Sequence, residues 1–230
     1  MLIFLLVACT PSTGTLIEPD LPGTAIVEPE SERVFASEPS DWMVVLDITW
    51  PVGRPGGRPI DAHFSWLALA THEPDVSMWS LREPASPGMT DMAEWGGTQR
   101  LVGEMEDQGA DVWEWRHWTC PEGIVHDNCA ESGHLISLQG GQTHFSAASM
   151  LGPSPDWFIG VDSEPLVDGE FWRNEVVIDL FPLDAGTRDA NAWDLYGEQS
   201  TPPWPISPIL DETRQLIGPG QIGRLTLIRR

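Results

Sequence analysis

Alternating apolar and polar side chains predict a half-buried strand at residues 42–50. The even positions from Trp42 to Trp50 are all apolar, whereas Asp47 and Thr49 fall on the other face. A period of two is typical of a strand with one face in a core. Similar short runs recur at 64–71, 135–138, 145–151, 157–161, 175–183 and 224–229. The chain is therefore expected to contain seven or eight strands.

Helix signals are confined to the segment between the second and third of these runs. Residues 90–91 (Thr-Asp) predict the start of a short helix that ends at Gly96. Thr98 predicts the start of a second helix, with Leu101 and Met105 on one face. Many strands with two helices in one crossover predict an all-β fold, an antiparallel two-sheet sandwich.

Composition separates the chain into three parts. Residues 1–9 form an apolar segment, and residues 10–40 hold five prolines and six acids with almost no apolar periodicity. That composition is typical of a flexible acidic linker. Residues 41–230 contain no second linker long enough to divide them, so we expect one domain there. The 12 tryptophans supply enough large apolar side chains for a core.

The net charge of the chain limits the classes of partner that it can bind. The formal net charge is -23, and all 12 basic residues are arginine. Nucleic-acid binding needs clustered basic side chains, so nucleic acid is not an expected partner. No apolar run reaches the roughly 18 residues that span a bilayer, so we expect no transmembrane helix.

At the end of the N-terminal apolar segment, Leu6, Val7 and Ala8 precede Cys9. This arrangement resembles the lipobox of bacterial lipoproteins, in which the cysteine carries the lipid. The resemblance implies a signal-like segment over 1–9, export, and attachment of a cell-envelope or outer-membrane lipoprotein through lipid alone, on the surface or periplasmic side. Only eight residues precede Cys9 and none is basic, which departs from ordinary secretory signals. The alternative is a short apolar N-terminus with an ordinary buried cysteine.

Two further cysteines are expected to form a disulfide. Cys120 and Cys129 form an even pair if Cys9 is lipidated, and export permits their oxidation. A zinc site with His117 or His126 is the alternative, but it lacks a second ligand pair at a recognised spacing.

Four segments stand out along residues 41–230: HFSWLALATH at 63–72, PSPDWFIGVDS at 153–163, DLFPLDAGT at 179–187 and IGRLTLIR at 222–229. In sequence and order they resemble the spondin N-terminal domain, found in F-spondin and mindin of animal extracellular matrix and in some bacterial surface proteins. The first segment departs from the family pattern at Trp66, where proline is usual, and at Leu69, where glycine is usual. The resemblance implies a C2-like sandwich of eight strands, a bound calcium ion, and extracellular adhesion or recognition rather than catalysis.

The family's calcium ligands can be carried over only in part. The resemblance places them at Asp156, at Asp184 and at a third position that is Arg188 in this chain, followed by Asp189. Either the loop shifts so that Asp189 reaches the ion, or Arg188 supplies a positive charge instead. Asp162 is a further, accessory candidate.

Without the family resemblance, the acidic residues do not decide whether this chain binds a metal ion. Calcium takes about six to eight oxygen ligands, which acidic loops can supply. In a chain with 35 acids, however, aspartates also cap turns or simply face water.

Two other functions, a carbohydrate-binding module and a metal-dependent hydrolase, are alternatives to recognition of a surface protein. Trp113 and Trp115 would share a strand face and could stack on a glycan, or could cover the core. A metal-dependent hydrolase would combine the aspartates with His144. The sequence has no GxSxG, phosphate-loop or HExxH motif, so an enzyme is not expected.

Overall fold

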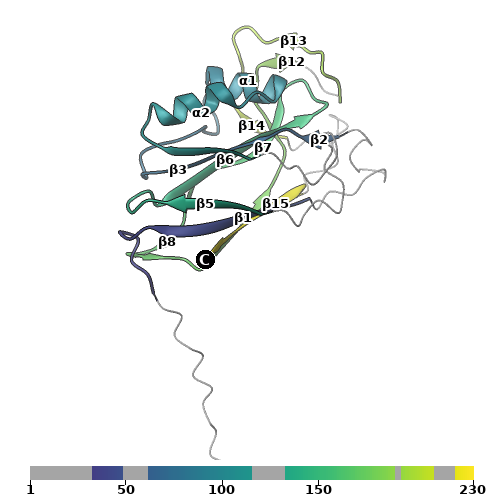
Figure 1. The fold of residues 1–230 in the computed structure, drawn as a ribbon. Helices are drawn as coiled ribbons and strands as arrows, with labels where there is room; N and C mark the ends of the chain where they lie inside the picture. The colour runs from purple at the N-terminus through teal and green to yellow at the C-terminus, as the bar shows by residue number, and fades with distance from the viewer. Residues whose placement is uncertain (1–32, 49–61, 116–132, 190–192, 210–220) are drawn as a thin grey trace, which may run out of the picture. The chain divides into compact units, whose positions relative to one another are not determined.

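Two antiparallel sheets pack face to face, and two helices lie on the outer face of the larger sheet (Figure 1). The computed structural model describes residues 33–48, 62–115, 133–189, 193–209 and 221–230. Within them, eight strands have five or more residues. The predicted all-β sandwich is therefore confirmed. Residues 33–230 form one compact unit.

The smaller sheet has the strand order β10–β15–β1–β5. In β1, Trp42, Val44 and Leu46 are buried in the core between the sheets, as their alternation predicts. The strands are β1 (Ser40–Ile48), β5 (Gly133–Leu138), β10 (Glu175–Leu180) and β15 (Gly223–Arg229).

The larger sheet has the order β14–β11–β7–β6–β3–β4, with β2 also paired to β6. It is covered on both sides: Leu67 and Leu69 of β3 enter the core between the sheets, whereas Ala68 and Ala70 join a second core under the helices. The strands are β2 (His63–Phe64), β3 (Leu67–His72), β4 (Asp111–Trp115), β6 (His144–Gly152), β7 (Trp157–Pro165), β11 (Leu183–Asp184) and β14 (Ser207–Pro208). Two short hairpins pair β8 (Val167–Asp168) with β9 (Phe171–Trp172), and β12 (Arg188–Asp189) with β13 (Glu198–Gln199).

Helix α1 (Pro87–Trp95) begins earlier than the sequence predicts. Ser86, not residues 90–91, is the N-cap, and its Oγ accepts a hydrogen bond from Met89 N at 3.0 Å. Proline at the first helical position favours this start because its fixed φ suits a helix. The predicted end at Gly96 is confirmed, with a left-handed φ of 70°.

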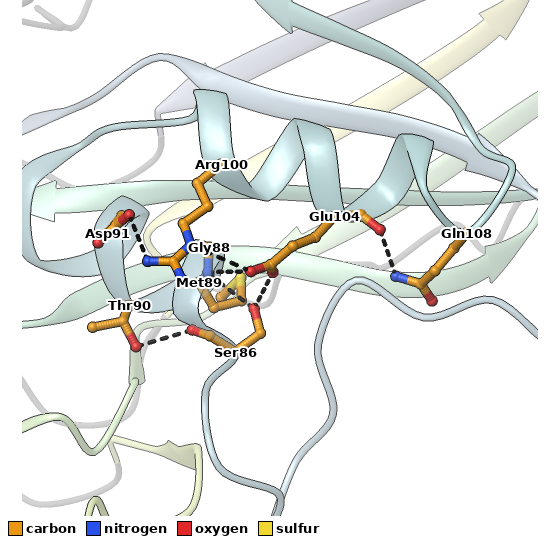
Figure 2. A network of polar contacts seen from close by, with 8 residues as sticks. All are labelled: Ser86, Gly88, Met89, Thr90, Asp91, Arg100, Glu104 and Gln108. Atoms are coloured by element: carbon orange, nitrogen blue, oxygen red, sulfur yellow. Dashed lines mark hydrogen bonds and ion pairs between the residues drawn. The ribbon is translucent and has the colours of Figure 1, made fainter.

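Helix α2 (Gln99–Glu106) packs beside α1 and buries Leu101 and Met105, as predicted. Thr98 occupies the N-cap position, but its hydroxyl donates to Glu114 on β4 instead of capping the helix. Glu104 connects the two helices: its carboxylate accepts from Ser86 Oγ at 2.5 Å and from Gly88 N at 2.7 Å (Figure 2).

The segment 34–39, assigned to the linker from composition, packs against the β8–β9 hairpin. Ala36 N donates to Glu170 O at 2.8 Å, and Trp172 N donates to Val34 O at 2.9 Å. The ring of Phe35 lies 4.7 Å from that of Phe171. Backbone pairing and aromatic contact thus extend the packed region ahead of β1.

Several predictions concern residues outside the described ranges. They include the lipobox with Cys9, most of the linker, and the pair Cys120 and Cys129. Lipidation and the disulfide therefore stay predictions. In the part of the chain that the structure describes, no helix has the length and apolar character needed to cross a membrane.

Candidate cation site

Asp156 and Asp184 lie together at one end of β7 and β11. Asp156 directly precedes β7, and the strand register places Asp184 opposite Trp157. Ala185 N donates to the main-chain oxygen of Asp156 at 3.1 Å, which closes the turn beside the pair. Asp156 is fully buried and Asp184 is 8% exposed. The structure thus brings together the two aspartates that the family resemblance singled out.

The loop after β11 wraps one oxygen of Asp156. Asp156 Oδ2 accepts hydrogen bonds from Thr187 N at 2.7 Å, Arg188 N at 2.9 Å and Thr187 Oγ1 at 3.2 Å. The other oxygen, Oδ1, is buried and has no hydrogen-bond partner within the described residues. A buried carboxylate oxygen without a partner destabilises the folded state, so binding of a proton or a cation at this atom would be favourable.

The electrostatics of the aspartate pair also favours a bound proton or cation. Burial raises the pKa of Asp156 to about 7, and the negative charge of Asp184 adds to the rise. The hydrogen bonds from Thr187 and Arg188 oppose it, because they stabilise the ionised form. A bound cation would offset the repulsion between the two carboxylates and keep both ionised.

Asp156 and Asp184 carry carboxylate oxygens, a type of ligand that calcium prefers. Among the residues described, no group of three or more His, Cys, Asp or Glu side chains is placed to hold a metal ion. A calcium ion at this pair would need backbone carbonyl oxygens and water to complete its six to eight ligands.

The side chain of Arg188 reaches helix α1, where it contacts Glu94. Its guanidinium donates to Glu94 Oε2 at 2.6 Å and to Gly197 O at 3.2 Å, and it lies 5.7 Å from the ring centre of Trp95. The hydrogen bond with Glu94 raises the pKa of Arg188, the charges of Glu94 and Asp156 add to this, and burial opposes it. The guanidinium of Arg188 therefore mainly neutralises Glu94, while the main-chain N–H of Arg188 donates a hydrogen bond to Asp156.

Asp189 and Asp162 do not join the pair. Asp189 Oδ1 accepts from Ser200 Oγ at 3.0 Å and Trp204 Nε1 at 3.3 Å. Asp162 lies six residues beyond Asp156, about 20 Å along an extended strand. The donors to Asp162 are Ser77 Oγ, Met78 N, Trp79 N and Ser146 Oγ. These bonds tie the segment before α1 to the sheet, which gives Asp162 a structural role.

The residues of the other two functions do not assemble into sites. Trp115 is buried in the core between the sheets, and Trp113 packs against the same cluster. These two tryptophans therefore cover the core. His144 pairs with Pro165, nine residues from Asp156 and about 30 Å along the strand, so the two cannot share a catalytic cleft.

Exposed aromatic side chains near the loop after β11 were missed at the level of sequence. Trp95 is 68% exposed, Trp204 64% and Tyr196 82%. Trp95 lies under Arg188, Trp204 donates to Asp189, and Tyr196 precedes the glycine whose carbonyl binds Arg188. Tyr196 and Trp204 stand in irregular segments and Trp95 is the last residue of α1, so the three share no periodic signal, and only the fold reveals that they gather here.

Comparison with known proteins identifies the family of the chain. The Spondin_N family model matches residues 42–215. Human Spondin-2 is 36% identical over 138 residues, which cover 60% of this chain and 41% of the relative. Spondin-1 of Rattus norvegicus is 28% identical over 178 residues, or 73% of this chain and 21% of the relative. The chain spans less than half the length of these relatives. With most of its length matched by the family model, the chain belongs to the spondin N-terminal domain family.

Proposed function

We propose that this protein is a calcium-binding recognition or adhesion module of the cell surface or extracellular space. Membership in the spondin family supports the recognition function. The buried Asp156 Oδ1, which has no hydrogen-bond partner within the described residues, carries the calcium part of the proposal. Together with Asp184, it offers a charged oxygen site where a divalent cation would stabilise the fold.

The surroundings of the pair support a role in recognition. Loop 184–188 binds Asp156 through its amides, and Gly186 O accepts from Trp204 N at 2.7 Å. A cation at the pair would hold this loop in place and, through it, the exposed Trp204. Tryptophan, tyrosine and arginine are the residues that most often dominate binding energy at interfaces.

We further propose that the domain is exported and reaches the membrane only through a lipid on Cys9. Residues 10–32 would then act as a tether between the anchor and the domain. In an oxidising compartment, Cys120 and Cys129 would be bridged. The partner would be a surface protein or a glycan.

Titration of the full chain with calcium tests the proposal. Calcium should raise the melting temperature of the wild type, and EDTA should lower it again. Asp184→Asn should lose the response, because it removes one of the two ligand charges. Asp168→Asn is the matched control, since Asp168 is exposed on the separate β8–β9 hairpin. A flat calorimetric titration of the wild type at millimolar calcium would contradict calcium binding.

A further inference from the structure

A second feature, separate from the aspartate pair, is an open pocket of about 390 Å³ beside the helix pair. It lies where the β2–β3 turn, the α1–α2 turn and β4 meet, and it has both polar and apolar walls. Trp66 and Trp95 provide aromatic walls, and Gln99 and Glu114 provide polar groups. Its volume falls in the range of about 300–1,000 Å³ that is usual for small-molecule sites.

Hydrogen bonds and close packing between the wall residues fix the shape of the pocket. Ser65 N donates to Met150 O at 3.0 Å, and Met150 N donates to Ser65 Oγ at 3.0 Å, so the β2–β3 turn is fixed to β6. Gly96 ends α1 so close to this turn that a Cβ atom there would lie 2.8 Å from Ser65 Cβ. Thr98 donates to Glu114, which fixes this carboxylate at the pocket wall. A preformed site binds more tightly, because less ordering is needed.

The charges around the pocket limit the class of ligand that it can bind. Among the described residues that line the pocket, Glu114 is the one carboxylate and none is an arginine, and the chain carries a net charge of -23. An anionic ligand would be repelled. A cation is also disfavoured at Trp95, because the Arg188 guanidinium already lies over that ring. A neutral ligand with an apolar face and several hydroxyl groups fits what is left.

Trp95 is the surface on which such a ligand would pack. Its ring is 68% exposed at the end of helix α1, so it offers a large apolar area to a ligand. Glu114 can accept hydrogen bonds from hydroxyl groups, and Gln99 can both donate and accept them. A pyranose ring combines these properties, since it has an apolar C–H face and a rim of hydroxyls.

We propose that this pocket binds a neutral saccharide, with Trp95 and Trp66 against the sugar face and Gln99 and Glu114 on its hydroxyls. This inference rests on the proposed recognition function and names the partner as a glycan. It uses Trp66 and Trp95 rather than Trp113 and Trp115, which the fold commits to the core.

The test is binding of the fluorescently labelled full chain to immobilised neutral glycans (glucosides, galactosides, mannosides and N-acetylglucosaminides) and to their sialylated or sulfated counterparts. The wild type should bind at least one neutral glycan and should bind the anionic ones more weakly. Gln99→Ala and Trp95→Ala should each lower the affinity, Trp95→Ala by about tenfold or more. Phe181→Ala, which removes an exposed aromatic side chain outside the pocket, should leave binding unchanged.

Two variants keep the result interpretable. Gln99→Ala removes an exposed polar side chain and does not touch Arg188. Glu114→Gln retains an acceptor for Thr98 but removes the charge, so it should weaken binding without unfolding the protein. Thermal melts of every variant in calcium separate a lost ligand contact from a lost fold.

Three outcomes would overturn the inference: binding to no neutral glycan at millimolar concentration, a preference for anionic glycans, or neutral binding that Trp95→Ala and Gln99→Ala leave intact. The calcium titration is run on the same preparation. A chain that responds to calcium but binds no glycan would refute the saccharide pocket alone. A chain that binds glycan through Trp95 without a calcium response would refute only the calcium part of the proposed function.

Discussion

Arg188 connects two carboxylate environments that the sequence places far apart. Its main-chain N–H binds Asp156, while its guanidinium pairs with Glu94, 94 residues earlier in the chain. Glu94 is only 6% exposed, and its other oxygen has no hydrogen-bond partner among the described residues. Glu94 thus depends on Arg188 for neutralisation, since a buried carboxylate without a partner is strongly destabilising.

Arg188→Ala should therefore lower the free energy of unfolding by about 3 kcal/mol, because it leaves Glu94 buried and unpaired. Arg188→Ala combined with Glu94→Gln should recover much of the loss. Urea unfolding followed by tryptophan fluorescence measures both effects. Arg100→Ala is the control: its pair with Asp91 is exposed, so the expected loss is below about 1 kcal/mol. Equal losses for the two arginine variants would show that the Glu94 pair contributes little.

A second substitution at the same residue separates its two possible roles. Arg188→Asp restores an acid at the family's third ligand position and removes a positive charge beside the pair. Calcium should bind this variant more tightly than the wild type, whereas in EDTA its melting temperature should be lower, because Glu94 loses its partner. At a calcium concentration a hundredfold above Kd, binding stabilises the fold by about 2.7 kcal/mol. A wild type without a calcium response would contradict calcium binding at the pair, and the lower stability of Arg188→Asp would then report only the loss of the Glu94 pair.

At the scale of elements, helix α1 depends on a side chain from its neighbour. Two donors at the start of α1, Ser86 Oγ and Gly88 N, converge on the carboxylate of Glu104 in α2 (Figure 2). A negative charge at a helix N-terminus is favourable, because it interacts with the helix dipole and with amides that have no partner inside the helix. The two helices therefore behave as one unit on the sheet.

Glu104→Ala should destabilise the protein by about 1–2 kcal/mol, because it leaves the Gly88 amide and the Ser86 hydroxyl without their acceptor. Glu104→Gln should cost less, since the amide oxygen still accepts one of these bonds. The matched control is Glu106→Ala, an exposed acid on the same helix. Urea unfolding gives the stabilities, and hydrogen exchange at the Gly88 amide shows whether α1 opens. If Glu104→Ala and Glu106→Ala proved equal, the coupling between the helices would be ruled out.

The long strands were predictable because burial on one or both faces leaves a pattern of six or more residues, as in Ser40–Ile48. Two-residue strands such as Arg188–Asp189 carry no such pattern. The start of α1 was misplaced, because Ser86 and Pro87 stand in a loop-like run and the partner of Ser86, Glu104, is distant in sequence. The nearness of Asp156 and Asp184 followed from the family resemblance, whereas the pairing of Arg188 with Glu94 depends on how α1 docks.

At the scale of the whole molecule, the net charge of -23 favours cations and disfavours anions. The summed field raises the local concentration of calcium near the surface, and added salt screens this effect. The same field repels nucleic acid and acidic glycans. A calcium site and a neutral saccharide pocket are thus compatible with one strongly acidic surface, while an anionic partner would meet repulsion over most of it.

The last prediction concerns where the folded unit begins. Residues 34–38 contribute three hydrogen bonds to the β8–β9 hairpin: Ala36 N to Glu170 O, Trp172 N to Val34 O, and Trp172 Nε1 to Glu38 O. A chain of residues 33–230 should therefore match the stability of the full chain, because it keeps these bonds. A chain of residues 41–230 should fold, but its free energy of unfolding should be lower by about 2–4 kcal/mol, at about 1 kcal/mol for each bond together with the Phe35 and Ala36 contacts.

Urea unfolding of the three chains measures the differences. Glu38→Ala in the 33–230 chain is the control, since Trp172 bonds the main chain of residue 38 and not its side chain. Equal stability of all three chains would mean that residues 33–40 belong to the tether, as their composition alone suggests.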